Sequence, residues 1–221
     1  FRDPWTEIDY YRQLHLTPHS DRKQHQLERE VLTQADQVVT VAPDGARRLE
    51  ALGASNVKTI YNGFDWNDED RNTETRPQNE KFNLTYIGVL SKIQNPENLW
   101  EAICELVEES ESFGKKLQIN MIGQIDQSVE AAIRKAKLEQ YVVFRPYIPH
   151  EQVLQQQQAA DLLLLLLMPD STPRAKGLLT GKLFEYLSSG TPILCIGPED
   201  GDAAHIISEV QAGVTVDFED K

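Results

Sequence analysis

Residues 81–221 alternate short apolar runs with longer amphipathic segments, and this alternation leaves few folds open to the chain. Each apolar run has the length of a buried strand, and each segment between two runs repeats its apolar residues at the 3.6-residue period of a helix. Because a crossover helix follows each strand, neighbouring strands must be parallel. The pattern therefore predicts an α/β fold built on a doubly wound parallel sheet. The six expected strands are 82–89, 117–122, 141–144, 162–167, 192–196 and 214–216.

A smaller alternation precedes this segment, with a helix, a strand, a second helix and a second strand expected between residues 21 and 60. From Asn67 to Glu80 the chain has no aliphatic residue, which is typical of a solvated linker. We therefore expect part of a second α/β domain ahead of the large one. The three expected parts are the end of an N-terminal domain at 1–65, a linker at 66–80 and a Rossmann-like domain at 81–221.

The composition excludes several kinds of protein. A formal net charge of −13 argues against nucleic acid as a partner, because phosphate binding needs a basic face. Cys104 and Cys195, the two cysteines, are too few for a disulfide framework, which fits a reducing cytoplasm. None of the five histidines has a Cys or Asp at metal-ligand spacing, so no metal is predicted. The longest apolar run, 162–168, is too short to cross a membrane.

A short helix is predicted between Gly181 and Gly190, and its apolar residues share one face. Leu183, Phe184 and Leu187 form that face, which we expect to pack inward. The apolar residues 192–196 follow directly as a strand. In an open α/β sheet this places the helix N-terminus near the carboxyl ends of the strands, where ligands bind.

The charged residues around this helix form a basic cluster in an acidic chain. Lys182 lies in the first turn, where the helix dipole disfavours a cation by about 0.3–1 kcal/mol unless an anion is bound. Glu185, three residues later, is expected beside Lys182 on the outward face. Arg174 and Lys176 precede Lys182 with no acidic residue between. The cluster predicts an anion site, and the alternative is a set of ordinary solvated side chains.

The segment G-K-L-F-E-Y-L-S-S-G-T-P-I-L at 181–194 resembles the donor-binding helix and following strand of retaining glycosyltransferases with the GT-B fold, often called glycosyl transferases group one. The resemblance implies that Glu185 holds the ribose hydroxyls of a nucleotide-sugar and that Lys182 lies near its diphosphate. It also implies that Leu183, Arg174 and Lys176 belong to the same nucleotide-sugar site.

Three further segments carry this resemblance. Residues 35–53, with Y-N-G-F-D at 61–65, are similar to the end of the family's first domain and the start of its hinge. The residues F-R-D-P-W at 1–5 resemble a strand end on the acceptor side, or else an aromatic loop that packs on a core. In R-P-Y-I-P-H-E at 145–151, Tyr147 and Ile148 match the loop whose backbone meets the base.

The segment 88–102 resembles the family's first strand, loop and helix, which places Gly88 at the donor. Three positions depart from the family pattern. Val89 stands where an arginine is usual, Gln94 where a lysine is usual, and Gly177 where a glutamate is usual. The diphosphate would then be held by the remaining cations, Lys92 among them, or by backbone amides.

The resemblance implies transfer of a sugar from a UDP- or GDP-sugar to a polysaccharide or lipid-linked acceptor of a bacterial envelope, with no separate cofactor. We expect a piece of a longer protein that binds donor but turns over little, because the acceptor-facing residues of the family come largely from its first domain. No catalytic residue is therefore assigned to the chain. The expected location is the cytoplasm, with the inner face of the membrane and a peripheral membrane contact through the missing first domain as further options.

Two other functions stay open. A sugar-nucleotide epimerase of the same fold would use the same cleft without an acceptor, and a catalytically silent binding or scaffolding domain would explain the departures at Val89, Gln94 and Gly177. The sequence leaves the base, sugar, linkage, acceptor and oligomeric state undetermined.

Overall fold

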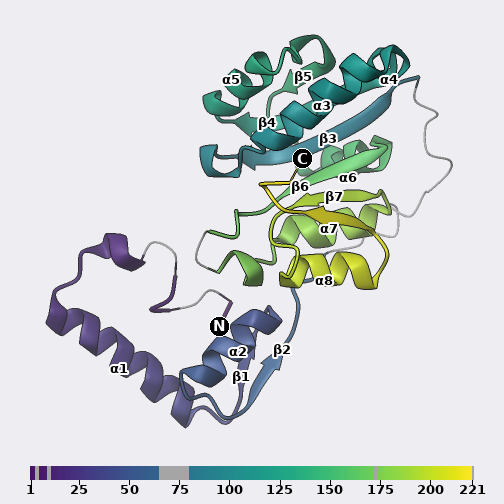
Figure 1. Ribbon diagram of the computed structural model, residues 1–221. Helices are drawn as coiled ribbons and strands as arrows, with labels where there is room; N and C mark the ends of the chain where they lie inside the picture. Colours follow the sequence, from purple (N-terminus) through teal and green to yellow (C-terminus); the bar gives the residue numbers. More distant parts are fainter. Residues whose placement is uncertain (3–4, 9–10, 65–79, 172–173, 221) are drawn as a thin grey trace.

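The computed structural model of the chain describes residues 1–2, 5–8, 11–64, 80–171 and 174–220. These residues form two α/β units that lie side by side (Figure 1), one built on a two-stranded parallel sheet and the other on a six-stranded parallel sheet. We call them the N-terminal unit, up to residue 64, and the C-terminal unit, from residue 80. Apart from Glu80, the predicted linker lies outside the described residues, as do Asp3, Pro4 and Asp65 of the segments compared above. The predicted domain boundaries stay predictions.

The N-terminal unit packs its helices on its small sheet. Thr17 caps the first helix by accepting the N–H of Ser20, and the helix therefore begins at Pro18, ahead of the predicted start. Leu32, Val38, Leu49 and Ala54 form its small core. Its elements are η1 (Tyr11–Leu14), α1 (Pro18–Gln34), β1 (Val38–Thr40), α2 (Pro43–Ala51) and β2 (Val57–Thr59).

The C-terminal unit contains the doubly wound sheet that the alternation predicts. Its strands are all parallel and lie in the order β5-β4-β3-β6-β7-β8, so the chain starts in the middle, builds outward to one edge and then to the other. This topology confirms the predicted fold class. The strands are β3 (Phe82–Leu90), β4 (Leu117–Ile125), β5 (Val142–Arg145), β6 (Leu162–Leu166), β7 (Ile193–Ile196) and β8 (Gly213–Val216).

Helices cover both faces of this sheet because alternate strand residues point to opposite sides. Leu164 and Leu166 join the core on the face of α3 and α5, whereas Leu163 and Leu165 join the core on the face of α7 and α8. The α-helices are α3 (Glu97–Glu109), α4 (Glu111–Lys116), α5 (Gln127–Lys135), α6 (His150–Ala159), α7 (Gly181–Ser189) and α8 (Asp202–Glu209). Short 3-10 turns add η3 (Lys92–Gln94), η4 (Glu139–Tyr141) and η5 (Ala175–Gly177).

The sheet opens between β3 and β6, where the direction of strand building reverses. These two strands are paired only at Leu84 with Leu162 and at Thr85 with Leu163. Farther along β3, the N–H of Ile87 donates to the hydroxyl of Tyr186 on α7, at 3.3 Å, in place of a strand partner. Such a reversal leaves a crevice at the carboxyl ends of the central strands, where ligands of open α/β sheets bind.

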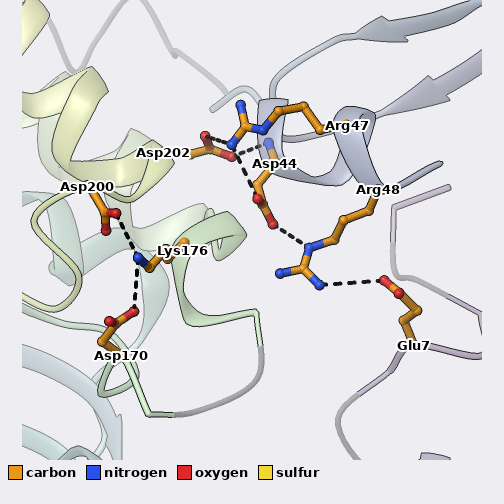
Figure 2. Close-up of polar contacts among 8 residues, drawn as sticks. All are labelled: Glu7, Asp44, Arg47, Arg48, Asp170, Lys176, Asp200 and Asp202. Atoms are coloured by element: carbon orange, nitrogen blue, oxygen red, sulfur yellow. Dashed lines mark hydrogen bonds and ion pairs between the residues drawn. The ribbon is translucent and has the colours of Figure 1, made fainter. Parts of the chain in front are cut away.

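The N-terminal unit contacts the C-terminal unit through α2, which packs against η5. The backbone N–H of Asp44, at the start of α2, donates to Oδ2 of Asp202 in the first turn of α8 at 2.8 Å (Figure 2). The two residues are 158 positions apart in sequence, so this bond ties the units together directly. Within the described part of the chain, no helix has both the length and the apolar character needed to cross a membrane.

Candidate functional site

A groove of about 520 Å³ lies at the carboxyl ends of β3 and β4, beside the point where the sheet opens. Five of the predicted site residues line it together. They come from the end of β3, the loop after β5 and the first half of α7, and they are Gly88, Tyr147, Ile148, Lys182 and Glu185. Distant parts of the sequence therefore meet where the resemblance placed a nucleotide-sugar.

Two glycines form the floor of the groove. Gly88 and Gly123 are register partners on β3 and β4, with φ of 137° and 120°. A Cβ on Gly123 would lie 2.2 Å from the carbonyl oxygen of Gly88, and a Cβ on Gly88 would lie 2.7 Å from Nζ of Lys182. Only glycine adopts these backbone angles at little cost, so the pair allows a close approach to the backbone here.

Lys182 does not face outward as expected. Its Nζ donates to the hydroxyl of Tyr86 at 3.1 Å and lies 4.3 Å from the centroid of that ring. The reason is that α7 starts at the carboxyl edge of the sheet, so a long side chain in its first turn folds back over the end of β3. Burial lowers the pKa of Lys182 to about 8. The lysine is thus a partly buried cation on the groove wall.

The start of α7 has no side-chain cap. Thr180 is the N-cap residue but its side chain accepts no amide, and the first turn contains no acidic residue. The first N–H groups of a helix lack partners within the helix, so those of Gly181 and Lys182 are available to an anion. Leu183 differs, because its side chain is fully buried and its N–H donates to the carbonyl of Thr180 at 3.1 Å. The Leu183 side chain therefore packs α7 onto the core, and its predicted binding role stays a prediction.

Gln157 is a groove residue that the sequence did not single out. It lies on α6 and lines the groove, and only 1% of it is exposed. Its backbone carbonyl accepts from the hydroxyl of Thr191 at 2.9 Å, whereas its Nε2 has no hydrogen-bond partner among the described residues. Buried donors are normally paired, and either water or a ligand can supply the missing acceptor. Four adjacent glutamines, 155–158, gave no signal that one of them points inward.

Arg174 and Lys176 lie apart from the groove, contrary to the predicted basic cluster. Nε of Arg174 lies 3.5 Å from Oε2 of Glu7 in the N-terminal unit. Nζ of Lys176 lies 2.7 Å from Asp200 and 3.7 Å from Asp170 (Figure 2). Glu7 and Asp200 are distant from the two cations in sequence, whereas Asp170 is a near neighbour. The two cations therefore balance charge around η5, at the junction of the units. Lys182 is the one lysine among the described residues that line the groove.

A second cavity, of about 290 Å³, lies between the two units. Its walls include Asp44 and Arg48 of α2 together with Thr180 and Gly181 at the start of α7. The hydroxyl of Thr180 is buried and has no hydrogen-bond partner among the described residues. Because Lys182 lines the groove and Thr180 and Gly181 line the cavity, the N-terminus of α7 separates the two spaces.

The structure shows what surrounds the three residues that depart from the family pattern. Val89 is 66% exposed at the groove, where it presents an apolar side chain. Gln94 donates to the carbonyl of Leu166 at 3.1 Å and so closes the end of β6. Gly177 lies against Asp44, as described below. In the described part of the chain, no three His, Cys, Asp or Glu side chains are placed to hold a metal ion.

The model of the family described as "Family 4 Glycosyltransferase in conflict systems" matches residues 4–203. No curated protein matches the chain. Among solved structures, it is similar to sucrose-phosphate synthase from Thermosynechococcus elongatus, at 18% identity and a TM-score of 0.62, over 95% of this chain and 52% of that one.

Two further solved structures are similar to the chain. WaaG, a glycosyltransferase involved in lipopolysaccharide biosynthesis, has 18% identity and a TM-score of 0.60, over 95% of this chain and 57% of that one. A mutant of S. aureus TarM, in complex with Fondaparinux, alpha-GlcNAc-glycerol and UDP, has 13% identity and a TM-score of 0.63, over 90% of this chain and 37% of that one. At such identities the similarity shows the fold alone. The chain spans about half, or less, of the length of these proteins.

Proposed function

Because the chain belongs to the family of family 4 glycosyltransferases in conflict systems, we propose that its groove binds the nucleotide of a nucleoside diphosphate sugar, the donor in a sugar-transfer reaction. The family makes it a transferase domain, and its sheet has the topology of GT-B glycosyltransferases. The identity of the donor, the identity of the acceptor and the stereochemistry of transfer are all part of this proposal.

The observation that carries the proposal is the meeting of Lys182 and Glu185 with Gly88 in one groove. A diphosphate at the start of α7 would form an ion pair with Lys182 and would accept hydrogen bonds from the backbone N–H groups of Gly181 and Lys182. A ribose one turn farther along α7 would meet Glu185, whose carboxylate can accept from two hydroxyls. A base would then lie toward Tyr147 and Ile148, within reach of the buried amide of Gln157.

The chemical contribution of these residues is the stabilisation of charge on a departing nucleoside diphosphate. As the bond from the sugar to the diphosphate breaks, negative charge grows on the phosphate oxygens, and a fixed cation and fixed amides favour that state. We propose transfer with retention to a polysaccharide or lipid-linked acceptor, with support from the resemblance of 181–194. A cytoplasmic location belongs to the same proposal, since the expected donors are UDP- and GDP-sugars.

Calorimetric titration with UDP, GDP, UDP-glucose and GDP-mannose tests the donor site. We expect one of the two bases to bind, and we expect Lys182→Met and Glu185→Ala each to weaken that binding about tenfold or more. Lys115→Met is a matched control, because Lys115 forms an exposed i,i+4 pair with Glu111 on α4, away from the groove. Absence of binding with every ligand, or an equal effect of the control, would contradict the proposal.

A catalytically silent nucleotide-sugar-binding domain is the second candidate, and the exposed apolar Val89 at the groove favours it. A silent domain would bind donor with the same dependence on Lys182 and Glu185. Release of nucleoside diphosphate over time, with and without added sugar acceptors, separates the two. Binding without any release supports the silent domain, whereas release that depends on Lys182 supports transfer.

A further inference from the structure

The cavity between the units contains a carboxylate that comes from outside the donor-binding unit. Asp44 lines it from the start of α2, and its side chain is only 16% exposed. The other acidic residues on its walls are Glu7 and Glu28. Both oxygens of Glu28 are bonded to Thr6, by its N–H and by its hydroxyl, and Glu7 is paired with Arg48 and Arg174. Asp44 is the carboxylate that lies against the segment leading into α7.

That contact is very close and depends on a glycine. A Cβ on Gly177 would lie 2.9 Å from Oδ2 of Asp44 and 3.0 Å from its Cβ. Any other residue at 177 would therefore push the carboxylate away. Gly177 ends η5, and the chain runs from it directly to Thr180 and Gly181 on the cavity wall. The missing side chain at 177 leaves room for an acid from the other unit.

The position of the cavity indicates what would occupy it. A diphosphate bound at the N-terminus of α7 has the groove on one side and the cavity on the other. With a nucleoside in the groove, the group attached to the far phosphate enters the cavity. In a nucleotide-sugar this group is the sugar, and hydroxyl groups are donors that a carboxylate binds well. The volume, about 290 Å³, is near the lower limit of about 300 Å³ for small-molecule sites.

We propose that Asp44 binds hydroxyl groups of the donor's sugar and thereby helps to select it, as a specificity-determining carboxylate that the N-terminal unit supplies to the C-terminal unit. This inference rests on the proposed donor site. Arg48 holds Oδ2 of Asp44 from Nε at 2.6 Å, and Arg47 holds Oδ1 at 3.2 Å. Each bond uses one acceptor position, and a carboxylate offers about four, so each oxygen keeps capacity for a sugar hydroxyl. The two arginines fix the acid in the orientation that Figure 2 shows.

The test compares affinity for a nucleotide with and without its sugar. Calorimetry gives the ratio of the dissociation constants for UDP and UDP-glucose, or for GDP and GDP-mannose, using whichever pair binds more tightly. We expect Asp44→Ala to reduce this ratio about tenfold and to leave affinity for the bare nucleotide unchanged. The backbone N–H that bonds to Asp202 is retained in this variant. Asp44→Asn keeps the shape of the side chain and replaces Asp44→Ala in the test if the alanine variant does not fold. We expect it to reduce the ratio by a smaller factor.

A rescue experiment separates sugar binding from simple packing of the units. Only loss of the Asp44 Cβ, 3.0 Å from an added Cβ at 177, frees the space beside Gly177. Gly177→Glu in an Asp44→Gly background should therefore restore the ratio, whereas Gly177→Gln in the same background should not. An unchanged ratio in Asp44→Ala, a loss that Gly177→Glu does not restore, or equal rescue by Gly177→Gln would overturn the inference. In each of these cases nucleotide binding would persist and the proposed function would stand. No binding of either nucleotide to the unmodified chain would overturn both.

Discussion

The position of Lys182 suits anion binding but disfavours the charged form of the lysine. A diphosphate site needs a fixed cation, but fixing it over Tyr86 removes much of its water, and burial lowers its pKa to about 8 from 10.5. Charged groups placed where the fold alone would not favour them are typical of functional sites. In the described structure its neighbours are the ring and hydroxyl of Tyr86, and the charge of Glu185 opposes part of the effect of burial on its pKa.

Replacement of Lys182 by methionine is therefore expected to stabilise the fold while it weakens donor binding. The unfolded chain binds more protons than the folded chain between pH 8 and pH 10.5, so the stability of the unmodified protein should rise with pH across that window. At pH 7 the methionine variant should be more stable by about 2 kcal/mol, a value reduced for the partial exposure of the side chain. Urea unfolding at pH 7 and pH 10 measures this. If the methionine variant gained the same stability at pH 7 and at pH 10, the charge of Lys182 would not be the cause of the gain.

Glu185 should give the site a preference for ribose over deoxyribose. A carboxylate bound to both hydroxyls loses one partner when the 2′-hydroxyl is absent, which lowers affinity by about 1.5–3 kcal/mol for a charged hydrogen bond. We expect the unmodified protein to bind UDP or GDP more tightly than the 2′-deoxy form, and Glu185→Ala to bind both forms equally weakly. Competition titrations measure the two affinities. A preference that survives in Glu185→Ala would place the ribose elsewhere.

At the scale of elements, local pattern determined most of what could be predicted. The strands follow from apolar runs, which need only neighbouring residues. By contrast, the alternation predicts one crossover helix after each strand, whereas both α3 and α4 lie between β3 and β4. The second of them, Glu111–Lys116, is short and polar and begins at a cap, Ser110, that directly follows α3. The six-residue element carries too little periodicity to predict.

Five of the predicted site residues, on three elements, line the groove, but spacing within one element pointed only to two of them. Lys182 and Glu185 lie on a single helix, so their spacing was informative, although the direction of Lys182 was not. Arg174 and Lys176 were expected in one cluster with Lys182, but they pair with Glu7 and with Asp170 and Asp200, and Arg174 lines the second cavity. Glu7 and Asp200 lie far from these cations in the sequence, so spacing could not reveal them. The burial of Gln157 was hidden for another reason, since its neighbours on α6 are also glutamines.

The glycine pair between β3 and β4 is an element-scale feature with a clear test. Gly123→Ala would put a Cβ 2.2 Å from a backbone carbonyl, a clash that no side-chain rotation relieves. We expect a loss of about 3–5 kcal/mol in the free energy of unfolding, because strand register and backbone angle must both change. Gly63→Ala is the control, since nothing lies within 4 Å of its added Cβ, and it should change stability by less than about 0.5 kcal/mol. Equal stability of the two variants in urea unfolding would contradict the role of Gly123.

At the scale of the whole molecule, the N-terminal unit depends on its neighbour. Its sheet has two strands, and four residues form its buried core, whereas an isolated two-stranded sheet is marginal in water. Polar contacts join it to the C-terminal unit through Asp44 and Arg47 with Asp202 (Figure 2), and Ala42 and Tyr61 add apolar contacts to the core and to Phe184. The stability of the N-terminal unit should therefore depend on its contacts with the C-terminal unit. The sugar site proposed at this junction should depend on the same contacts.

Asp202→Ala tests this dependence. The residue is 4% exposed, and its side chain accepts the N–H of Asp44 and faces Arg47 at 4.0 Å. Its removal should lower the stability of the N-terminal unit by about 1–2 kcal/mol, since burial of the carboxylate offsets part of the lost bond, and amide exchange in α1, β1, α2 and β2 should become roughly 5- to 30-fold faster. Exchange in β3 and β4 should stay unchanged. Hydrogen exchange followed by mass spectrometry resolves these segments.

Asp161→Ala provides the matched comparison for Asp202→Ala. Oδ2 of Asp161 also accepts a distant backbone N–H, that of Asn83 at 2.8 Å, but both residues lie in the C-terminal unit. If the junction controls the first unit, Asp161→Ala should accelerate exchange around β3 and leave α1 and α2 as they are, which reverses the pattern of Asp202→Ala. Faster exchange over the whole chain in both variants would mean that the two units unfold together. The N-terminal unit would then be a part of one cooperative structure, and the position of Asp44 in the cavity would be as stable as the central sheet itself.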